Sequence, residues 1–433
     1  MALSVRKDTI VSPGSTGNQA TSGLGFTPKV LFLWSAYQTN DANTHGNAFF
    51  SYGVGTRDGG ATQQWNQKYA QTDAAATTDV IPELLTTGIL SGYVLPGFTV
   101  DFLVTLTSFD ADGFTLNWTD LPATASIIVH YMALGGSSIA SARAGSFTTS
   151  TAAATQDVTI NTGFGKPDLL SFTAGGIGGG SGIGWAKSST ERRYVSQKEN
   201  WGAATSTPVA IQHDRAFITY NTPASTPGLI DSQADLSVVG SWPTDGFQVA
   251  YSDQASYGDL VGYVGLKGDF TATIGDTTVP ISGSPPVDQN LTLASGVPQA
   301  AFLCGLSIPT DGTLDSTHAD LLGFALGGTD GAREGVAGWT TDDAAADSNV
   351  GRFSTTTKAF RHCVAPAVAT NPPSTLSEAD ASIVGSDLRL SWSTVDSVAR
   401  SFSYVILGAV PVVWPPNQDP GPALHTIQSN QRI

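Results

Sequence analysis

The sequence predicts an all-β protein of three tandem antiparallel β-sandwich domains followed by an extended C-terminal arm. Three observations support this fold class. The 433 residues include 48 Gly and 23 Pro, which favours many turns. Apolar and polar residues alternate in short runs, and no window keeps helical periodicity beyond about three turns. Finally, 40% of the residues are hydrophobic, which is enough for packed cores.

The chain contains the same hairpin pattern three times, in the stretches 113–136, 246–268 and 387–409. The first strand of each hairpin carries an aromatic residue at the same place: Trp118, Tyr251 and Trp392. The second strand carries a tyrosine before a small apolar run: Tyr131, Tyr263 and Tyr404. Upstream, a proline introduces an apolar strand in each copy: Pro28, Pro167 and Pro298. Because these anchors keep both their order and their approximate spacing, we interpret them as a triplication whose aromatic anchors form the repeat cores.

The anchors place the three repeats at residues 1–140, 141–270 and 271–410. Within each repeat we expect a Pro-led strand, a long Gly-, Ala- and Thr-rich excursion, a further strand and the hairpin. The last strand of the first hairpin, residues 127–134, is largely apolar on both faces. Such a strand lies inside a sandwich or under a neighbouring copy. A stack of three copies meets that need.

The composition changes after Ala409. Residues 411–433 are rich in proline, which cannot donate to the ladder of a central strand. We therefore expect an extended arm that lies on another surface, most simply another subunit. Its assembly contacts are predicted at Trp414, Pro415 and Pro416.

The net charge of −16 makes nucleic acid and anionic lipid surfaces poor partners. No run approaches the roughly 18 apolar residues of a membrane span, so we expect no membrane insertion. The N-terminal residues lack the apolar core of a signal peptide, which predicts synthesis in a host cytoplasm without secretion. Cys304 and Cys363 are expected to be free, buried thiols, because two cysteines do not make a disulfide framework.

A search for catalytic chemistry finds no nucleophile, zinc or phosphate-loop motif. Asp110 and Asp112 form an acidic pair of the kind glycosidases use, but their position before a hairpin strand favours turn formation. Asp342, Asp343 and Asp347 allow either helix capping or a cation site, and their spacing favours capping. His130 has no second ligand at metal spacing and is expected to be a half-buried imidazole with its hydrogen bonds satisfied. The sequence thus predicts a non-enzymatic protein with no catalytic residue, metal site or cofactor.

The nine tryptophans offer the remaining candidate binding groups. Trp118 and Trp392 occupy equivalent strand positions and are expected to pack in cores. Trp34, Trp65 and Trp201 lie nearer to loops, where an aromatic face can hold a sugar or a partner protein. We take these three as candidate binding residues.

The order of a Pro-led strand, a turn-Gly-Phe strand and a strand ending in Tyr-x-Ala-Leu-Gly resembles the H-type lectin-like module. The first copy carries this order in "FTPKVLFLW", "DADGFTLNW" and "IIVHYMALGG". The same pattern resembles β-sandwich domains of tailed-bacteriophage virion proteins. Copy three departs from it, since Asp387 and Leu388 stand where Gly-Phe is expected. The lectin resemblance implies that three joined copies can form a pseudo-trimer, and it transfers no sugar-contacting residue.

These observations predict a non-enzymatic structural protein on the exterior of a tailed-phage capsid or tail, with both locations open. Its partners are expected to be other virion proteins in a multi-copy assembly. The alternative is a lectin-like receptor-binding protein that recognises host cell-surface glycans. A glycan hydrolase ranks third, because no acidic pair stands apart from turn formation.

Overall fold

A computed structural model describes residues 2–58, 60–74, 80–95, 99–123, 126–175, 180–198, 209–220, 230–256, 258–281, 284–308, 322–342, 349–365 and 371–410. Within these ranges the chain is almost entirely β-strand, and the one helical element is a single 3₁₀ turn, Val239–Ser241. The strands of the described residues pair antiparallel in six sheets. The all-β, antiparallel fold class is confirmed.

The first sandwich combines a six-stranded and a four-stranded sheet. The larger sheet has the order β1 (Ser4–Val11), β11 (Ile128–Gly135), β3 (Pro28–Ser35), β5 (Ala48–Asp58), β6 (Ala61–Gln71) and β7 (Val80–Leu85). The smaller sheet has the order β2 (Gly17–Ser22), β10 (Gly113–Asp120), β9 (Thr99–Asp110) and β8 (Leu90–Val94).

The second sandwich repeats this topology strand for strand. Its larger sheet has the order β12 (Ile139–Thr148), β21 (Leu260–Gly268), β14 (Leu169–Gly175), β15 (Gly180–Ala186), β16 (Arg192–Lys198) and β17 (Val209–His213). Its smaller sheet has the order β13 (Thr155–Thr159), β20 (Gly246–Asp253), β19 (Ile230–Leu236) and β18 (Phe217–Tyr220).

The third sandwich has the same order again, with one strand added. Its larger sheet runs β22 (Phe270–Thr278), β31 (Ser401–Ala409), β24 (Val297–Leu306), β25 (Leu322–Thr329), β26 (Glu334–Thr341), β27 (Val350–Thr355) and β4 (Ala42–His45). Its smaller sheet runs β23 (Val287–Thr292), β30 (Asp387–Thr394), β29 (Ser374–Val384) and β28 (Phe360–Val364). The seventh strand, β4, belongs to the first copy and pairs with β27, so the first copy completes a sheet of the third.

The sequence anchors fall on matching strands. Tyr131, Tyr263 and Tyr404 lie on β11, β21 and β31, opposite the residues Leu33, Phe172 and Leu303 of the Pro-led strands. Trp118, Tyr251 and Trp392 lie on β10, β20 and β30, and each is buried in the core of its own sandwich. Chain triplication therefore appears in the strand order as well as in the sequence pattern.

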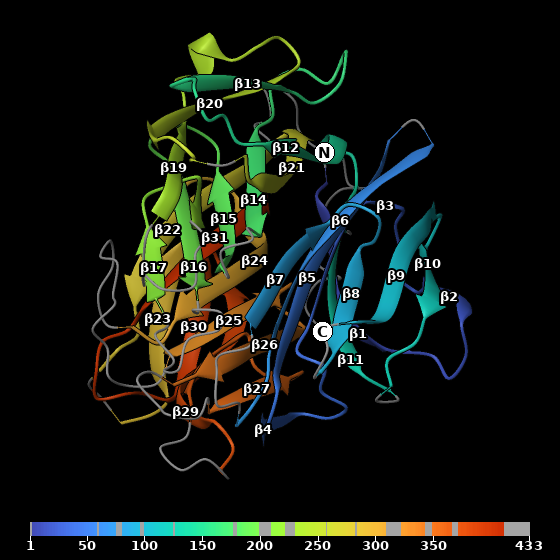
Figure 1. The fold of residues 1–433 in the computed structure, drawn as a ribbon. Coiled ribbons are helices and arrows are strands. Elements are labelled where there is room, and N and C mark those ends of the chain that lie inside the picture. The colour runs from blue at the N-terminus through green and yellow to red at the C-terminus, as the bar shows by residue number, and fades with distance from the viewer. Residues whose placement is uncertain are drawn as a thin grey trace, which may run out of the picture.

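A fourth hydrophobic core joins the three sandwiches to one another. The alternation of β3 explains how: Leu31 and Leu33 point into the first sandwich, while Val30, Phe32 and Trp34 point into the shared core. Both faces of the larger sheets are thus covered, which accounts for strands that are apolar on both sides. Figure 1 shows the blue-to-cyan first copy, the green second copy and the orange-to-red third copy gathered around this region.

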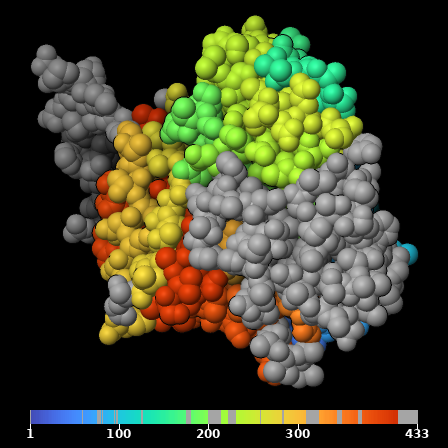
Figure 2. Space-filling model, turned by 60° about the vertical axis from the view of Figure 1, so that its left-hand side comes forward, coloured from blue at the N-terminus to red at the C-terminus, as the bar shows by residue number. Residues whose placement is uncertain are grey.

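The three copies form a ring with the same contact repeated. Strands β5 and β6 of the first copy pack on β12 of the second, and β16 of the second packs on β22 and β24 of the third. In the third copy, β26 packs back on β1 and β3 of the first. Equivalent surfaces meet each time, as in a closed heterologous trimer. Figure 2 shows the green-to-yellow second copy seated directly on the yellow-to-red third copy.

Candidate functional site

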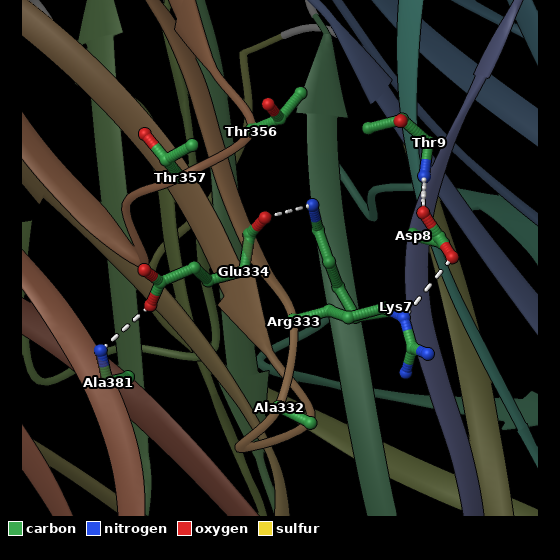
Figure 3. A pocket seen from close by; sticks show the side chains of 9 residues that line it. All are labelled: Lys7, Asp8, Thr9, Ala332, Arg333, Glu334, Thr356, Thr357 and Ala381. Atoms are coloured by element: carbon green, nitrogen blue, oxygen red, sulfur yellow. Dashed lines mark hydrogen bonds and ion pairs between the residues drawn. The ribbon is translucent and has the colours of Figure 1, made fainter.

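The junction of the third and first copies contains a polar pocket of about 330 Å³, here called the Lys7 pocket. Strand β1, the start of β26 and its preceding turn, and β29 supply its walls. Its lining residues, drawn in Figure 3, are Lys7, Asp8, Thr9, Ala332, Arg333, Glu334, Thr356, Thr357 and Ala381. Residues from the two ends of the chain therefore share one surface depression.

Lys7 forms the floor of this pocket, and its side chain is 1% exposed. Its Nζ donates a hydrogen bond to the carbonyl oxygen of Glu334 at 2.6 Å and lies 3.3 Å from Nδ1 of His130. The other ring nitrogen of His130, Nε2, lies 2.8 Å from Oγ of Ser354 in the third copy. The indole of Trp34 stacks on the imidazole at 5.6 Å. A continuous polar chain thus crosses the junction inside an apolar surround.

Burial decides the protonation states of Lys7 and His130 in this hydrogen-bonded series. Loss of solvent lowers the pKa of Lys7 to about 8, although Asp8, Asp330 and Glu334 act in the opposite direction. Burial, together with the charge of Lys7, lowers the pKa of His130 well below its usual value. The imidazole is therefore neutral at pH 7. With Nδ1 accepting from the ammonium, Nε2–H donates to Ser354.

Glu334 is the acidic counterpart of Lys7 in the pocket. Burial and the neighbouring Asp380 raise the pKa of its carboxyl to about 8, although the hydrogen bond from the backbone N–H of Ala381 opposes the shift. That N–H donates to Oε2 of Glu334 at 2.8 Å. Asp380 is held by Nζ of Lys358 at 2.8 Å. Glu334 is consequently protonated over much of the neutral range.

Room for Lys7 and His130 comes from Gly335. A Cβ atom at this position would lie 2.1 Å from Nζ of Lys7 and 2.5 Å from Nδ1 of His130. The strand registers place Gly335 of β26 where Trp65 stands in β6. At the junction of copies one and two, that Trp65 lies against Gly262, the equivalent of His130. At each of these two junctions a large side chain meets a glycine. The large residue lies on the outer strand at one junction (Trp65 on Gly262) and on the facing strand at the other (His130 on Gly335).

The junction of copies two and three contains an ion pair at the equivalent place. Arg193 of β16 occupies the position of Trp65 and Gly335, and it pairs with Asp276 of β22. Asp214, in the turn that follows β17, also pairs with Arg193. One aromatic contact, one ion pair and one buried Lys–His chain therefore close the three equivalent junctions.

The chemistry open to the Lys7 pocket follows from this arrangement. An amine with a pKa near 8 is the type that serves as a base or nucleophile. Here, however, Nζ is engaged by the Glu334 carbonyl and His130, and almost none of the side chain is exposed. The exposed rim, Asp8 and Arg333, offers one carboxylate and one guanidinium, which pair at 3.4 Å. The buried groups hold two copies together, and the rim leaves hydrogen-bonding groups at the surface.

Two of the predicted binding residues, Trp34 and Trp65, do not lie at the surface. Trp34 and Trp65 are completely buried in the core between the copies, so neither offers an aromatic face to a glycan. Nε1 of Trp65 donates to the carbonyl oxygen of Tyr263 at 2.7 Å, so this tryptophan contacts the second copy of the same chain. Trp201, and the arm residues Trp414, Pro415 and Pro416, lie outside the described residues.

Other sequence interpretations find direct counterparts. Asp112 lies in the turn between β9 and β10, as expected, and its side chain accepts hydrogen bonds from the N–H groups of the distant Gly23 and Gly25. Asp342 accepts from the N–H of Asn349 at 2.9 Å, whereas Asp343 and Asp347 lie outside the described residues. Cys304 and Cys363 are free and buried. His130 is fully buried, deeper than predicted, because the third copy covers it with Ser354 and Gly335.

Sequence reasoning missed Lys7 and Glu334 altogether. Lys7 stands in a run of four polar residues, Arg6 to Thr9, so its sequence context resembles an exposed position. Glu334 opens a strand after a turn, which is a common place for a solvated acid. The strand pairing shows that Lys7 is the equivalent of Ala144 in copy two, which is buried. This equivalence identifies Lys7 as a residue that points into the protein.

Within the described ranges, no three His, Cys, Asp or Glu side chains converge in a way that could hold a metal ion. The same part of the chain contains no helix of the length and apolarity needed to cross a membrane.

Fold and site together define an all-β protein of three antiparallel sandwiches whose equivalent junctions have diverged. Comparison of the chain with family models, with curated proteins and with solved structures gives no match.

Proposed function

We propose that this chain is a non-enzymatic structural protein of a tailed-phage virion, acting through protein–protein packing as a capsid decoration or a tail component. The observation that carries the proposal is the covalent ring of three sandwiches around one shared core. Fusion of the copies removes the entropic cost of bringing three subunits together. A body built in this way suits repeated attachment to a particle surface.

The junction chemistry supports the same function. Each junction is filled by its own complementary set, namely Trp65 on Gly262, Arg193 with Asp276, and the Lys7–His130 pair over Gly335. Because the sets differ, copies cannot exchange places or slip without leaving a cavity, a clash or a buried charge. These packed contacts favour a rigid scaffold with fixed outward faces.

The direct test is the composition of the particle. Particles released by the cells that encode the chain are purified by density and size, and their proteins are quantified by mass spectrometry. An antibody against the recombinant chain then locates it by electron microscopy. Many copies at one regular location support the proposal, whereas a chain recovered only from the particle-free fraction overturns it.

Glycan recognition is the second candidate, and the rim of the Lys7 pocket favours it. Asp8, Arg333, Thr356 and Thr357 present carboxylate, guanidinium and hydroxyl groups around one depression. This set can donate to and accept from sugar hydroxyls. A glycan array with the intact chain tests the idea, with Asp8→Asn as the site variant and Asp157→Asn as the matched distant control. Binding lost only in Asp8→Asn supports it, and binding shown by neither or by both variants alike contradicts it.

A further inference from the structure

A second pocket at the junction of copies one and three, about 300 Å³ in volume, shares no lining residue with the Lys7 pocket. We call it the Tyr37 pocket. The first copy supplies most of its wall, and Arg352 of β27 reaches in from the third copy. The lining residues are Tyr37, Asn47, Phe49, Tyr93, Leu95, Asp101, Ala123 and Arg352.

Arg352 brings an unmatched charge to this pocket. Its Nη1 donates to the carbonyl oxygen of Asn47 at 2.8 Å, and its guanidinium lies over the ring of Phe49 at 5.1 Å. Its Nε is buried and has no hydrogen-bond partner. Two other arginines at this junction have acidic partners, since Arg361 pairs with Glu378 at 2.8 Å and Arg333 with Asp8 at 3.4 Å, but no carboxylate of the described residues pairs with Arg352. A largely buried guanidinium without an acid is unfavourable unless an anion joins it.

Tyr37 adds backbone strain at the same place. Its φ is +62°, in the left-handed region that bulky residues rarely occupy. The ring is stacked on Phe49 at 4.8 Å and tilted against Phe102 at 5.0 Å. Gly92 makes the fit possible, since a Cβ there would lie 2.3 Å from the tyrosine ring. Strain held by its surroundings in this way concentrates at ligand sites.

Asp101 also lines this pocket, but it forms no ion pair with Arg352 among the described residues. Its Oδ2 accepts the hydroxyl proton of Tyr37 at 2.6 Å, and its Oδ1 accepts from the N–H of Ala123 at 3.0 Å. The N–H of Ala123 also lies 3.2 Å from Oδ2, and a carboxylate with two oxygens has the capacity to accept a further hydrogen bond. The rings of Tyr37 and Phe49 stack on each other at 4.8 Å, and both residues line the pocket beside the guanidinium.

We propose that the Tyr37 pocket binds a monosaccharide-sized molecule that carries a carboxylate. The carboxylate pairs with Arg352, a hydroxyl of the ligand donates to Asp101, and the aromatic side chains of the lining enclose the ring of the ligand. The pocket volume fits a monosaccharide, and the guanidinium without an ion pair among the described residues favours an acid over neutral sugars. This site goes beyond the structural function. It is also independent of glycan recognition in the Lys7 pocket, because the two pockets have separate linings.

The test is calorimetric titration of the intact chain with galacturonate and N-acetylneuraminate, with galactose as the matched neutral probe. We expect both acids to bind and galactose to bind at least ten-fold more weakly. Arg352→Gln should weaken acid binding at least ten-fold, whereas Arg333→Gln, at the rim of the other pocket, should leave it unchanged. Circular dichroism checks that each variant is folded.

A second variant covers the case in which Arg352→Gln does not fold. Gly92→Ala keeps the guanidinium but pushes on Tyr37, and it should also weaken binding of the acids. No acid binding by the wild-type chain at millimolar ligand overturns the proposal. Equal affinities for galacturonate and galactose, or acid binding that survives in every folded variant of Arg352 and Gly92, overturn it as well.

Discussion

Ser171 and Trp185 face each other across β14 and β15, and together they fill the place that Phe32 and Val54 fill in the first copy. In the third copy the corresponding pair is Phe302 with Gly328. Trp185 reaches the shared core from the neighbouring strand and lies 5.7 Å from Phe32 and 4.9 Å from Phe302. The three rings meet where the copies converge, although one of them comes from a different strand.

This relationship predicts that the two positions of the second copy are coupled. Trp185→Val leaves a cavity and should cost about 2–5 kcal/mol, and Ser171→Phe overpacks the core and should cost about 1–3 kcal/mol. The double variant reproduces the Phe–Val pair of the first copy. Its loss of stability should therefore be smaller than the sum of the single losses by ~0.5–3 kcal/mol. Urea-unfolding midpoints of the four proteins measure the coupling, and strictly additive losses would contradict it.

Gly335→Ala should destabilise the junction of copies one and three. The added Cβ meets Lys7 and His130, which have little room to move, and overpacking of this kind costs about 1–3 kcal/mol. Gly14→Ala is the matched control, because a Cβ at Gly14 meets nothing within 4 Å. Thermal unfolding of the two variants makes the comparison. Equal melting temperatures would show that the Lys7–His130 pair does not fill this space tightly.

Glu334 should make stability fall as pH rises through neutrality. The pKa of Glu334 is raised to about 8 in the folded chain, so the folded state binds more protons than the unfolded state above pH 4.5. The stabilisation that comes from this raised pKa is fully present below pH 4.5 and is lost as pH rises through about 8. Glu334→Gln removes this contribution, so the variant should gain stability relative to wild type as pH rises from 5 to 8.

Urea-unfolding midpoints at pH 5, 6.5 and 8 test this dependence, with Glu191→Gln as the control on a solvated glutamate whose side chain is 47% exposed. The quantity to follow is the difference between wild type and variant, because other groups titrate in the same range. A constant difference for Glu334→Gln across the three pH values would refute a raised pKa for its carboxyl.

Deletion of residues 411–433 should leave folding intact and abolish incorporation into particles. The described cores are closed by strands that end at Ala409, so the deletion removes no core residue of those ranges. Circular dichroism and melting temperature report folding, and co-sedimentation with particles reports incorporation. A scrambled arm of the same composition controls for length. Normal incorporation of the truncated chain would remove the assembly role predicted for Trp414, Pro415 and Pro416.

The candidate site was far less predictable than the fold. Tyr131, Tyr263 and Tyr404 mark equivalent strands because alternation and spacing act along the chain, where they can be read directly. Trp34 and Trp65 misled for the opposite reason. Both were interpreted as lying nearer to loops, but a neighbouring copy covers both side chains. Whether a strand face meets water or another copy is not encoded in the residues of that strand alone.

By itself, the sequence determined the all-β class, the threefold repetition and the two-sided apolar strands, since each follows from a periodic pattern of neighbouring residues. Only the tertiary structure decided which large side chain meets which small one. It placed Lys7 over Gly335, Trp65 on Gly262, and Arg352 beside Tyr37 without a carboxylate partner among the described residues. These pairs join residues far apart in the chain through shape and charge in the folded ring, and no local pattern carries that information.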